Sequence, residues 1–416
     1  MHISQRAQTL KPSATVAVAN RAKELKRHGV DVLSFAAGEP DFDTPERIKE
    51  AAIKALKAGQ TKYMPTLGDA ETRAVIAAKL TEENRLPGVT GEHVAISAGG
   101  KHGLYVAMQC LFDPPAPGQH AQEALLPVPA WVSYAPIVEM AGGRAVEIPT
   151  SAESGFKMSP EQLRGAITPQ SRVLILNSPS NPCGTMYSER DLRAIARVVH
   201  ETRDIAPDLV IFTDEIYEKI VYGADAHFSI GSVPEVAERT ITLNGLSKAY
   251  SMTGWRIGYT AASGAGGAKF IKAMGTLQGQ MTTNITSFSY PAIRVALTEC
   301  AGEVERFRQA FARRAELIHW LLRKMPGIEC PRPTGAFYVF PDVSSHFGKS
   351  SAHGRPISGA LDFAEAALDE AKIALVPGED FGGCGHNHVR ISFACSEEQI
   401  EEGMKRLGTF LGSLRG

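Results

Sequence analysis

The chain has 416 residues, of which 44% are hydrophobic and 21% charged, and its formal net charge is −1. This composition fits an ordinary soluble protein with room for two or three domains, and the near-zero charge excludes a general attraction to nucleic acid or to an anionic membrane. No apolar run reaches the length of a signal peptide or of a transmembrane helix. Six scattered cysteines without a C-x-x-C pair indicate reduced thiols in a cytoplasmic protein.

The first strong helix signal begins at Thr44, which we expect to cap a helix that has Pro45 in its first turn. This helix should continue to residue 58, where the following glycine ends it. Residues 93–97 then predict a strand, followed by a helix that ends near residue 112.

Three apolar runs in the middle of the chain predict strands that are buried on both faces, as in a parallel sheet. They cover residues 172–177, 208–213 and 239–244. Between the first two, residues 188–202 predict a helix that begins with a near capping box. This alternation of strands and helices predicts an α/β sheet with crossover helices.

The pattern changes beyond about residue 294, where helices and short strands no longer alternate regularly. We therefore predict two domains: residues 46–293 form a large domain around a mostly parallel sheet, and residues 1–45 together with 294–416 form a smaller α+β domain. The elements expected late in the chain are a helix over 297–324, a strand over 337–340, a helix over 361–371 and a strand over 373–376.

Polar segments follow three of the predicted strands directly, at residues 177–181, 214–217 and 245–248. Ligands of open α/β sheets bind at the carboxyl ends of the strands. The three segments should therefore meet at one site.

Lys248 stands among small residues, and Arg256 follows it by eight positions. A flat cofactor can approach such a lysine closely, and an amine in a crowded cationic site loses its proton more easily and can form a Schiff base with an aldehyde. The matching aldehyde is pyridoxal 5′-phosphate, whose phosphate the Arg256 guanidinium could hold. An isolated S-K pair more often marks an exposed lysine after a turn, so the prediction depends on further pieces of the same site.

Asp214 and Tyr217 belong to the run D-E-I-Y after a predicted strand. A carboxylate there could pair with the pyridine nitrogen and keep it protonated, which makes the ring an electron sink. Tyr217 would lie on the same side if the chain turns helically, and could hydrogen-bond the ring oxygen O3′. Taken alone, D-E-x-Y indicates an acidic helix start equally well.

Three other segments could complete the cofactor site. Asn181, in N-P-C-G, offers a neutral amide to O3′, although proline and glycine also suit a tight turn. Gly99 and Gly100 could expose backbone N–H groups to a phosphate, although a G-G pair also serves packing. Trp131 could stack on the ring, although a lone tryptophan more often belongs to the core.

Arg390 lies between apolar residues on a predicted strand. A buried arginine needs an anionic partner, which could be a substrate α-carboxylate or an internal carboxylate. His386 and His388 are close in sequence, but an i, i+2 pair of histidines more often belongs to a solvated loop, so no metal site is predicted.

Together these motifs resemble the class I aminotransferases, the pyridoxal-phosphate enzymes of fold type I. The combination N-x-P-x-N-P-x-G, D-E-I-Y and S-K-x-x-x-x-T-G-x-R carries the resemblance, which extends from residue 11 to Arg390. The chain is most similar to the bacterial one-beta branch of aspartate aminotransferases. The resemblance implies pyridoxal phosphate as the cofactor and a homodimer with shared active sites, without nucleic-acid or membrane partners.

The resemblance also implies roles toward the cofactor. Lys248 would attach it and move the proton, Asp214 would face the pyridine nitrogen, and Asn181 and Tyr217 would bond O3′. The phosphate would be held by Arg256, Gly99, Gly100 and Tyr63, the last reaching in from a partner subunit.

The implied substrate contacts are shared between both ends of the chain. They are Gly38 and Arg390 for the α-carboxylate, Asn181 and Trp131 nearby, Lys101 for a side-chain carboxylate, and Lys11 at a position linked to prephenate.

The implied reaction is transamination of L-aspartate and 2-oxoglutarate to oxaloacetate and L-glutamate by a ping-pong mechanism. The alternatives are a prephenate, aromatic or alanine aminotransferase, a carbon–sulfur lyase on the same fold, or a non-catalytic ligand-binding module. One departure from the family is Gly245, which stands where many members carry a hydroxyl residue, so one phosphate contact is in doubt.

Overall fold

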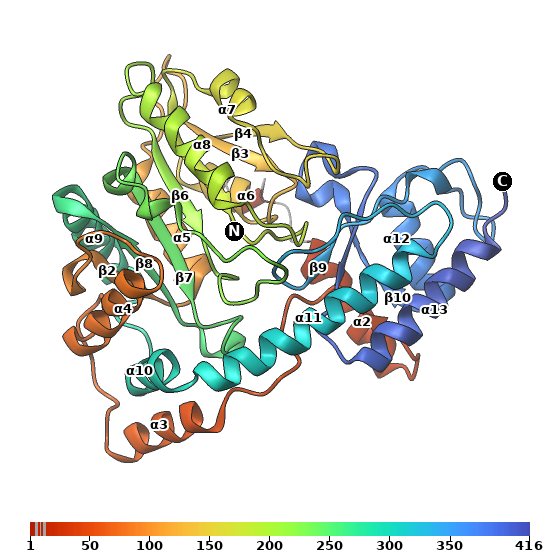
Figure 1. Cartoon of the computed structure of the whole chain (residues 1–416), viewed down its shortest axis with the longest axis horizontal. Helices are drawn as coiled ribbons and strands as arrows, with labels where there is room; N and C mark the ends of the chain where they lie inside the picture. Colours follow the sequence, from red (N-terminus) through yellow and green to blue (C-terminus); the bar gives the residue numbers. More distant parts are fainter. Residues whose placement is uncertain (5–6, 9, 11–13) are drawn as a thin grey trace.

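Residues 1–4, 7, 8, 10 and 14–416 are described by a computed structural model that has a larger and a smaller body. Helix α11 (Ala301–Arg323) runs from the larger body on the left of Figure 1 to the smaller body on the right.

A sheet of seven strands forms the centre of the larger body, and its strands run parallel except for β8. This confirms the predicted α/β fold with a mostly parallel sheet. In spatial order the strands are β2 (Val94–Ser97), β8 (Gly258–Ala262), β7 (Thr240–Gly245), β6 (Val210–Asp214), β5 (Ser171–Asn177), β3 (Glu123–Val128) and β4 (Arg144–Pro149).

Helices cover both faces of this sheet, which explains its continuous apolar strands. In β5, Val173 and Ile175 pack into the core of one face, while Leu174 packs into the core of the other. The first core is closed by α5 (Gly100–Leu111), α6 (Tyr134–Met140) and α9 (Gly264–Gly279), and the second by α7 (Pro160–Ala166) and α8 (Glu189–Glu201). At the β2 edge lie α3 (Glu46–Lys57), α4 (Ala70–Glu82) and α10 (Tyr290–Glu299).

The strands β5, β6 and β7 are neighbours, and they end at Asn177, Asp214 and Gly245. Asn177 is in register with Asp214, which is in register with Leu243. The three polar segments predicted to meet at one edge therefore do so.

Both ends of the chain build the smaller body. Strand β1 (Leu33–Ser34) pairs in parallel with β10 (Ile373–Ala374), so an early segment lies beside a late one. The division at residues 46 and 294 stays a prediction. The other elements are α2 (Ala14–Arg27), the antiparallel strands β11 (Val376–Pro377), β12 (Val389–Ser392) and β9 (Tyr338–Val339), and the helices α12 (Ala360–Ala371) and α13 (Glu397–Ser413).

Three predicted details are wrong. Thr44 does not cap α3, because its hydroxyl donates to the carbonyl oxygen of Ser251 at 2.7 Å. The long helix expected over 297–324 breaks at Cys300, where α10 packed on α3 gives way to α11. The strand expected over 373–376 is two short strands, because the chain changes partner from β1 to β12.

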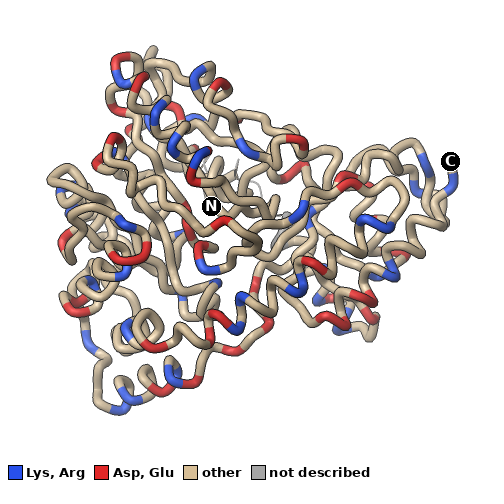
Figure 2. Tube along the Cα trace, in the orientation of Figure 1, with Lys and Arg blue, Asp and Glu red and all other residues tan. Residues whose placement is uncertain are grey.

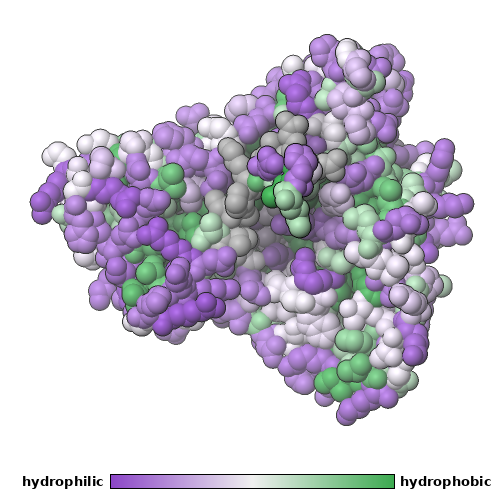
Figure 3. Space-filling model, turned by 180° about the vertical axis from the view of Figure 1, so that it is seen from behind, coloured by the Kyte–Doolittle hydropathy of each residue, from purple (hydrophilic) through white to green (hydrophobic). Residues whose placement is uncertain are grey.

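Charged residues of both signs are interspersed along the described trace (Figure 2). Hydrophilic residues dominate the face in Figure 3, with apolar residues in small groups. Within the described ranges, no helix combines the length and the apolar character that a membrane crossing requires.

A buried polar cluster lies behind the end of β6. Lys79 donates to Glu218 and, at 2.6 Å, to Asn84 Oδ1, while Asn84 Nδ2 donates to Glu218 at 2.6 Å and to Glu215 at 3.0 Å. Burial alone would raise the pKa of Glu218, but Lys79 and the nearby His227 lower it to about 2. The cluster therefore holds a buried ion pair on the far side of the Asp214–Tyr217 turn.

We expect Lys79→Met to lower the free energy of unfolding by about 3–5 kcal/mol, because it leaves the Glu218 carboxylate buried without its cation. The side chains of Lys79 and Glu218 are 5% and 8% exposed. The matched control is Arg164→Met in the open pair with Glu201, whose side chains are 52% and 44% exposed. This control substitution should lower the free energy of unfolding by less than about 1 kcal/mol. Equal losses in denaturant unfolding would contradict the assignment.

Candidate active site

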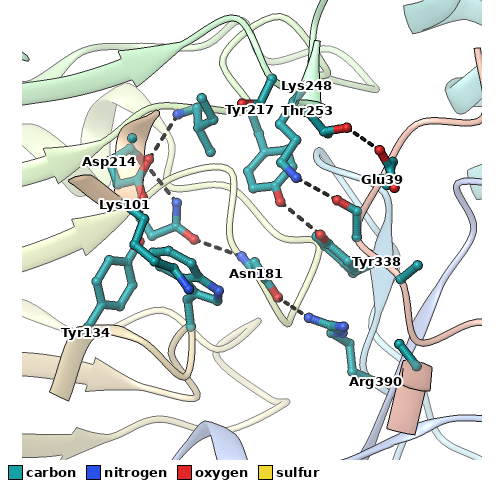
Figure 4. A pocket seen from close by; sticks show the side chains of 18 of the residues that line it. Glu39, Lys101, Tyr134, Asn181, Asp214, Tyr217, Lys248, Thr253, Tyr338 and Arg390 are labelled. Carbon is teal, nitrogen blue, oxygen red and sulfur yellow. Dashed lines mark hydrogen bonds between the residues drawn. The ribbon is translucent and has the colours of Figure 1, made fainter. Parts of the chain in front are cut away.

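A cavity of ≈ 430 Å³ opens at the carboxyl ends of β5, β6 and β7, and residues of both bodies line it (Figure 4). Most of the predicted site residues meet there. They are Gly38, Gly100, Lys101, Trp131, Asn181, Asp214, Tyr217, Lys248, Arg256 and Arg390.

The amine of Lys248 lies inside this cavity and donates to the carbonyl oxygen of Gly38 at 2.5 Å. Burial is the main cause that lowers the pKa of Lys248 to about 8, with Arg390 and Arg256 acting in the same direction. Glu39 and Asp214 oppose the shift. Roughly a tenth of the amine is therefore neutral, and nucleophilic, at pH 7, which is far more than in an ordinary exposed lysine.

Asp214 ends β6 and is buried. Its carboxylate accepts hydrogen bonds from Tyr134 Oη at 2.8 Å and from the backbone N–H of Ile216 at 3.2 Å. Burial raises the pKa of Asp214 to about 6, although these two donors and Lys248 favour the ionised form. A cationic partner in the cavity would stabilise this carboxylate further.

Two asparagines order the turn that follows β5. Asn177 donates to the carbonyl oxygen of Asp214 at 3.0 Å and accepts the backbone N–H of Asn181 at 2.8 Å. Asn181 Oδ1 accepts from Arg390 at 3.0 Å. Because the oxygen of this amide is engaged, its N–H₂ group is the donor that it can offer to a ligand.

Arg390 is 2% exposed, yet among the described residues no carboxylate lies within ion-pair distance of it. It donates to Asn181 and, at 2.6 Å, to the carbonyl oxygen of Ala36, and its Nε has no partner in the described part of the chain. The guanidinium lies 4.8 Å from the ring centre of Tyr338 and 5.2 Å from that of Phe381. The described residues thus give Arg390 no internal salt bridge, and an anionic ligand would fit beside it.

The start of α5 faces the guanidinium of Arg256. Gly99 has φ +86°, and a Cβ there would lie 2.5 Å from Arg256 Nη2. A Cβ on Gly258 would lie 2.4 Å from the backbone nitrogen of Gly100. Glycine is needed for this close approach, which places a guanidinium beside a helix N-terminus, a suitable cradle for a phosphate.

Gly245 has no room for a side chain that carries a hydroxyl group. A Cβ would meet the carbonyl oxygen of Ile257 at 2.7 Å. The buried Ser247 lines the cavity two residues later and carries a hydroxyl of its own.

Lys101 Nζ lies 4.9 Å from the ring centre of Trp131, which stands edge-on to Tyr134. Partial burial and the nearby Arg256 lower the pKa of Lys101. The described lining contains more basic than acidic side chains. The basic ones are Lys23, Lys101, Lys248, Arg256 and Arg390, and the acidic ones are Glu39 and Asp214.

Tyr63 and Lys11 are not among the described residues that line the cavity. Tyr63 is 88% exposed and lies beside Asn284 and Thr286, outside the cavity of its own chain. Lys11 falls outside the described residues.

Sequence reasoning missed several groups of the site. Tyr134, the donor to Asp214, follows Trp131 by three positions, and this spacing was its one signal. Glu39, which accepts from Thr253, and Tyr338 gave no signal, because Glu39 lies in an irregular segment and Tyr338 in an apolar run.

The cavity fits the pyridoxal phosphate expected from the sequence. The buried amine of Lys248 could bond to the cofactor aldehyde, and the buried carboxyl group of Asp214 could pair with a protonated pyridine nitrogen. The cradle formed by Gly99 and Arg256 could hold the phosphate.

Comparison with known proteins agrees with this chemistry. The family model "Aminotransferase class I and II" matches residues 30–407. The chain is 39% identical to the aspartate aminotransferase of Bacillus subtilis, with 99% of each covered, and 42% identical to the aspartate/prephenate aminotransferase of Cereibacter sphaeroides, with 97% of each covered. The crystal structure of the aspartate aminotransferase from Rhizobium meliloti superposes with a TM-score of 0.92 at 36% identity over 100% of both chains. The chain therefore belongs to the class I and II aminotransferases, and it is a pyridoxal-phosphate-dependent aminotransferase of fold type I.

Proposed function

We propose that the protein transfers the amino group of L-aspartate to 2-oxoglutarate, giving oxaloacetate and L-glutamate by a ping-pong mechanism. The observation that supports this proposal most strongly is a pair of cations, Arg390 and Lys101, which approach the cavity from different sides (Figure 4). The amine of Lys248 lies in the same cavity. One cation suits the α-carboxylate of the substrate and the other its side-chain carboxylate. Relatives named aspartate aminotransferase support this choice.

The cofactor would be held at three points. Lys248 would hold it covalently, Asp214 would face its ring nitrogen, and Arg256 with the start of α5 would hold its phosphate. Asn181 and Tyr217 would donate to its O3′. When bound, the cofactor supplies a carbon that carries the amino group and a ring that takes up electrons from the substrate Cα.

Lys248 would also act as the base. When Lys248 is not bonded to the cofactor, its Nζ would be free to take the proton from the substrate Cα. A pKa of about 8 suits this task, because the amine can be neutral before the transfer and can release the proton afterwards. Gly38, whose carbonyl oxygen lies 2.5 Å from Nζ, would keep the amine in place.

A single cavity explains the ping-pong order. The donor and the acceptor are both dicarboxylates, so each would need the same two cations, Arg390 and Lys101. They must therefore bind in turn, with the amino group stored between the two half-reactions.

We further propose a cytoplasmic homodimer in which Tyr63 serves the phosphate site of the partner. Two observations support this: Tyr63 is almost fully exposed in the single chain, and all six cysteines are free thiols.

Prephenate is a second candidate acceptor. Relatives of 42% identity carry the name aspartate/prephenate aminotransferase. Lys23, a further cation at the cavity, would add to the attraction for a second carboxylate.

A panel of half-reactions tests the proposal. The conversion of the pyridoxal to the pyridoxamine form is followed with aspartate, glutamate, alanine and phenylalanine, and the return with 2-oxoglutarate, oxaloacetate, pyruvate and prephenate. We expect the dicarboxylates to react fastest in both directions. In Lys101→Met they should slow by roughly 10²-fold, about the loss of one charge-assisted bond, while alanine and phenylalanine change little. Equal slowing of all substrates, or pyruvate released from cystathionine without transamination, would contradict the proposal.

The neutral amine of Lys248 should control capture of the cofactor. Because the pKa of Lys248 is lowered to about 8, the rate at which the apoprotein binds pyridoxal phosphate covalently should rise with pH and level off above about 8. Stopped-flow absorbance measures this rate. Lys248→Ala should bind without the covalent band, and borohydride should label Lys248 alone in the unmodified protein. A rate that keeps rising to pH 10 would exclude the lowered pKa.

Arg390→Ala should weaken the binding of every amino-acid substrate by roughly 2–5 kcal/mol, because it removes the partner of the α-carboxylate. Alanine should be affected as strongly as aspartate, which separates this variant from Lys101→Met. The matched control is Arg313→Ala, whose exposed side chain pairs with Glu397. Unchanged half-reaction kinetics in Arg390→Ala would refute the assignment.

A further inference from the structure

Tyr338 connects two groups of the cavity that have different tasks. It is buried on β9, and its hydroxyl lies 2.9 Å from that of Tyr217. The face of its ring lies 4.8 Å from the guanidinium of Arg390. Figure 4 shows Tyr338 between these two residues, pointing into the cavity.

We infer that Tyr338 is a positioning residue for transamination: its hydroxyl donates to Tyr217 and fixes the direction of the Tyr217 proton, and its ring supports Arg390. This inference rests on the proposed function of the site. It assigns two separable tasks to one side chain, one for the hydroxyl and one for the ring.

The hydroxyl task follows from counting protons. Each phenol has one proton to donate, and the two hydroxyl oxygens are within hydrogen-bond distance. If Tyr217 donates to the O3′ of the cofactor, its own oxygen must accept from Tyr338. Such a chain of donors strengthens each bond in it. Burial raises the pKa of Tyr217 well above its usual value, so Tyr217 keeps its proton for donation.

The ring task follows from the packing around it. A Cβ on Gly38 would lie 2.2 Å from the Tyr338 hydroxyl oxygen, and a Cβ on Gly184 would lie 1.9 Å from its carbonyl oxygen. Two glycines thus let other segments close on Tyr338 from both ends. Held in this way, the ring presents its face to the guanidinium of Arg390, a favourable contact for a buried cation.

The hydroxyl task is tested with Tyr338→Phe in the holoenzyme without substrate. A donor to O3′ stabilises negative charge on that oxygen, so a weaker donor should raise the pH at which the absorbance of the bound cofactor changes. We expect a rise of about 0.5–1 pH unit, the scale of one lost hydrogen bond. In a Tyr217→Phe background the same substitution should cause no further shift, because its effect passes through the Tyr217 hydroxyl.

The ring task is tested by the binding of succinate, a dicarboxylate without an amino group. Tyr338→Phe keeps the aromatic face and should change the Kd less than about twofold, whereas Tyr338→Leu should raise it about tenfold. Similar Kd values in the two variants would overturn the ring task.

Tyr222→Phe is the matched control, since Tyr222 is also buried in the core of the smaller body and donates to the backbone carbonyl of Ala336. It should lower the thermal stability without moving the cofactor titration. If Tyr338→Phe does not fold, Gly38→Ala displaces the Tyr338 hydroxyl and should shift the titration in the same direction. No shift, or a full shift in the Tyr217→Phe background, would overturn the hydroxyl task. Failure of the unmodified protein to show a cofactor band would instead refute the proposed function.

Discussion

The active site is organised around a positive charge that the described protein does not neutralise. Burying a guanidinium costs several kcal/mol unless an anion and hydrogen bonds compensate. At Arg390 the protein supplies two carbonyl oxygens and two aromatic faces, which hold the group but leave its charge in place. The missing part of the compensation is an anion, so the proposed binding of a substrate carboxylate rests on the burial of this one side chain.

An irregular segment, residues 36–44, makes this arrangement possible because it crosses the cavity between the two bodies. Irregular backbone can be buried only if its polar groups find partners. Here Arg390 donates to Ala36 and Lys248 donates to Gly38, while Asp41 pairs with Arg314 at 2.7 and 2.8 Å. The same segment thus holds the guanidinium of Arg390, the amine of Lys248 and helix α11. A displacement of this segment would disturb all three together.

The sequence predicted the sheet edge well and the supporting groups poorly, for physical reasons. Asn177, Asp214 and Lys248 follow apolar strands directly, and parallel strands bring their carboxyl ends together, so local pattern and topology agree. Tyr338 lies within an apolar run that indicates a core strand, and its position depends on contacts with Gly38, far away in sequence. The Thr44 cap failed for the same reason, because a distant carbonyl took its hydroxyl. Long-range partners leave no local signal.

The run D-E-I-Y serves two environments because its side chains point in opposite directions. Asp214 and Tyr217 line the cavity, while Glu215 and Glu218 enter the polar cluster behind it. Burial and the charge of Glu218 raise the pKa of Glu215 to about 8, so Glu215 is mostly uncharged at neutral pH. Lys79 balances Glu218. The cluster therefore adds little net charge behind the sheet edge, and Asp214 is left as the acid of this run that acts on the cavity. A charged Glu215 would compete with Asp214 for the protons and cations of the site. This competition is avoided because Glu215 is kept neutral and Glu218 is paired with Lys79.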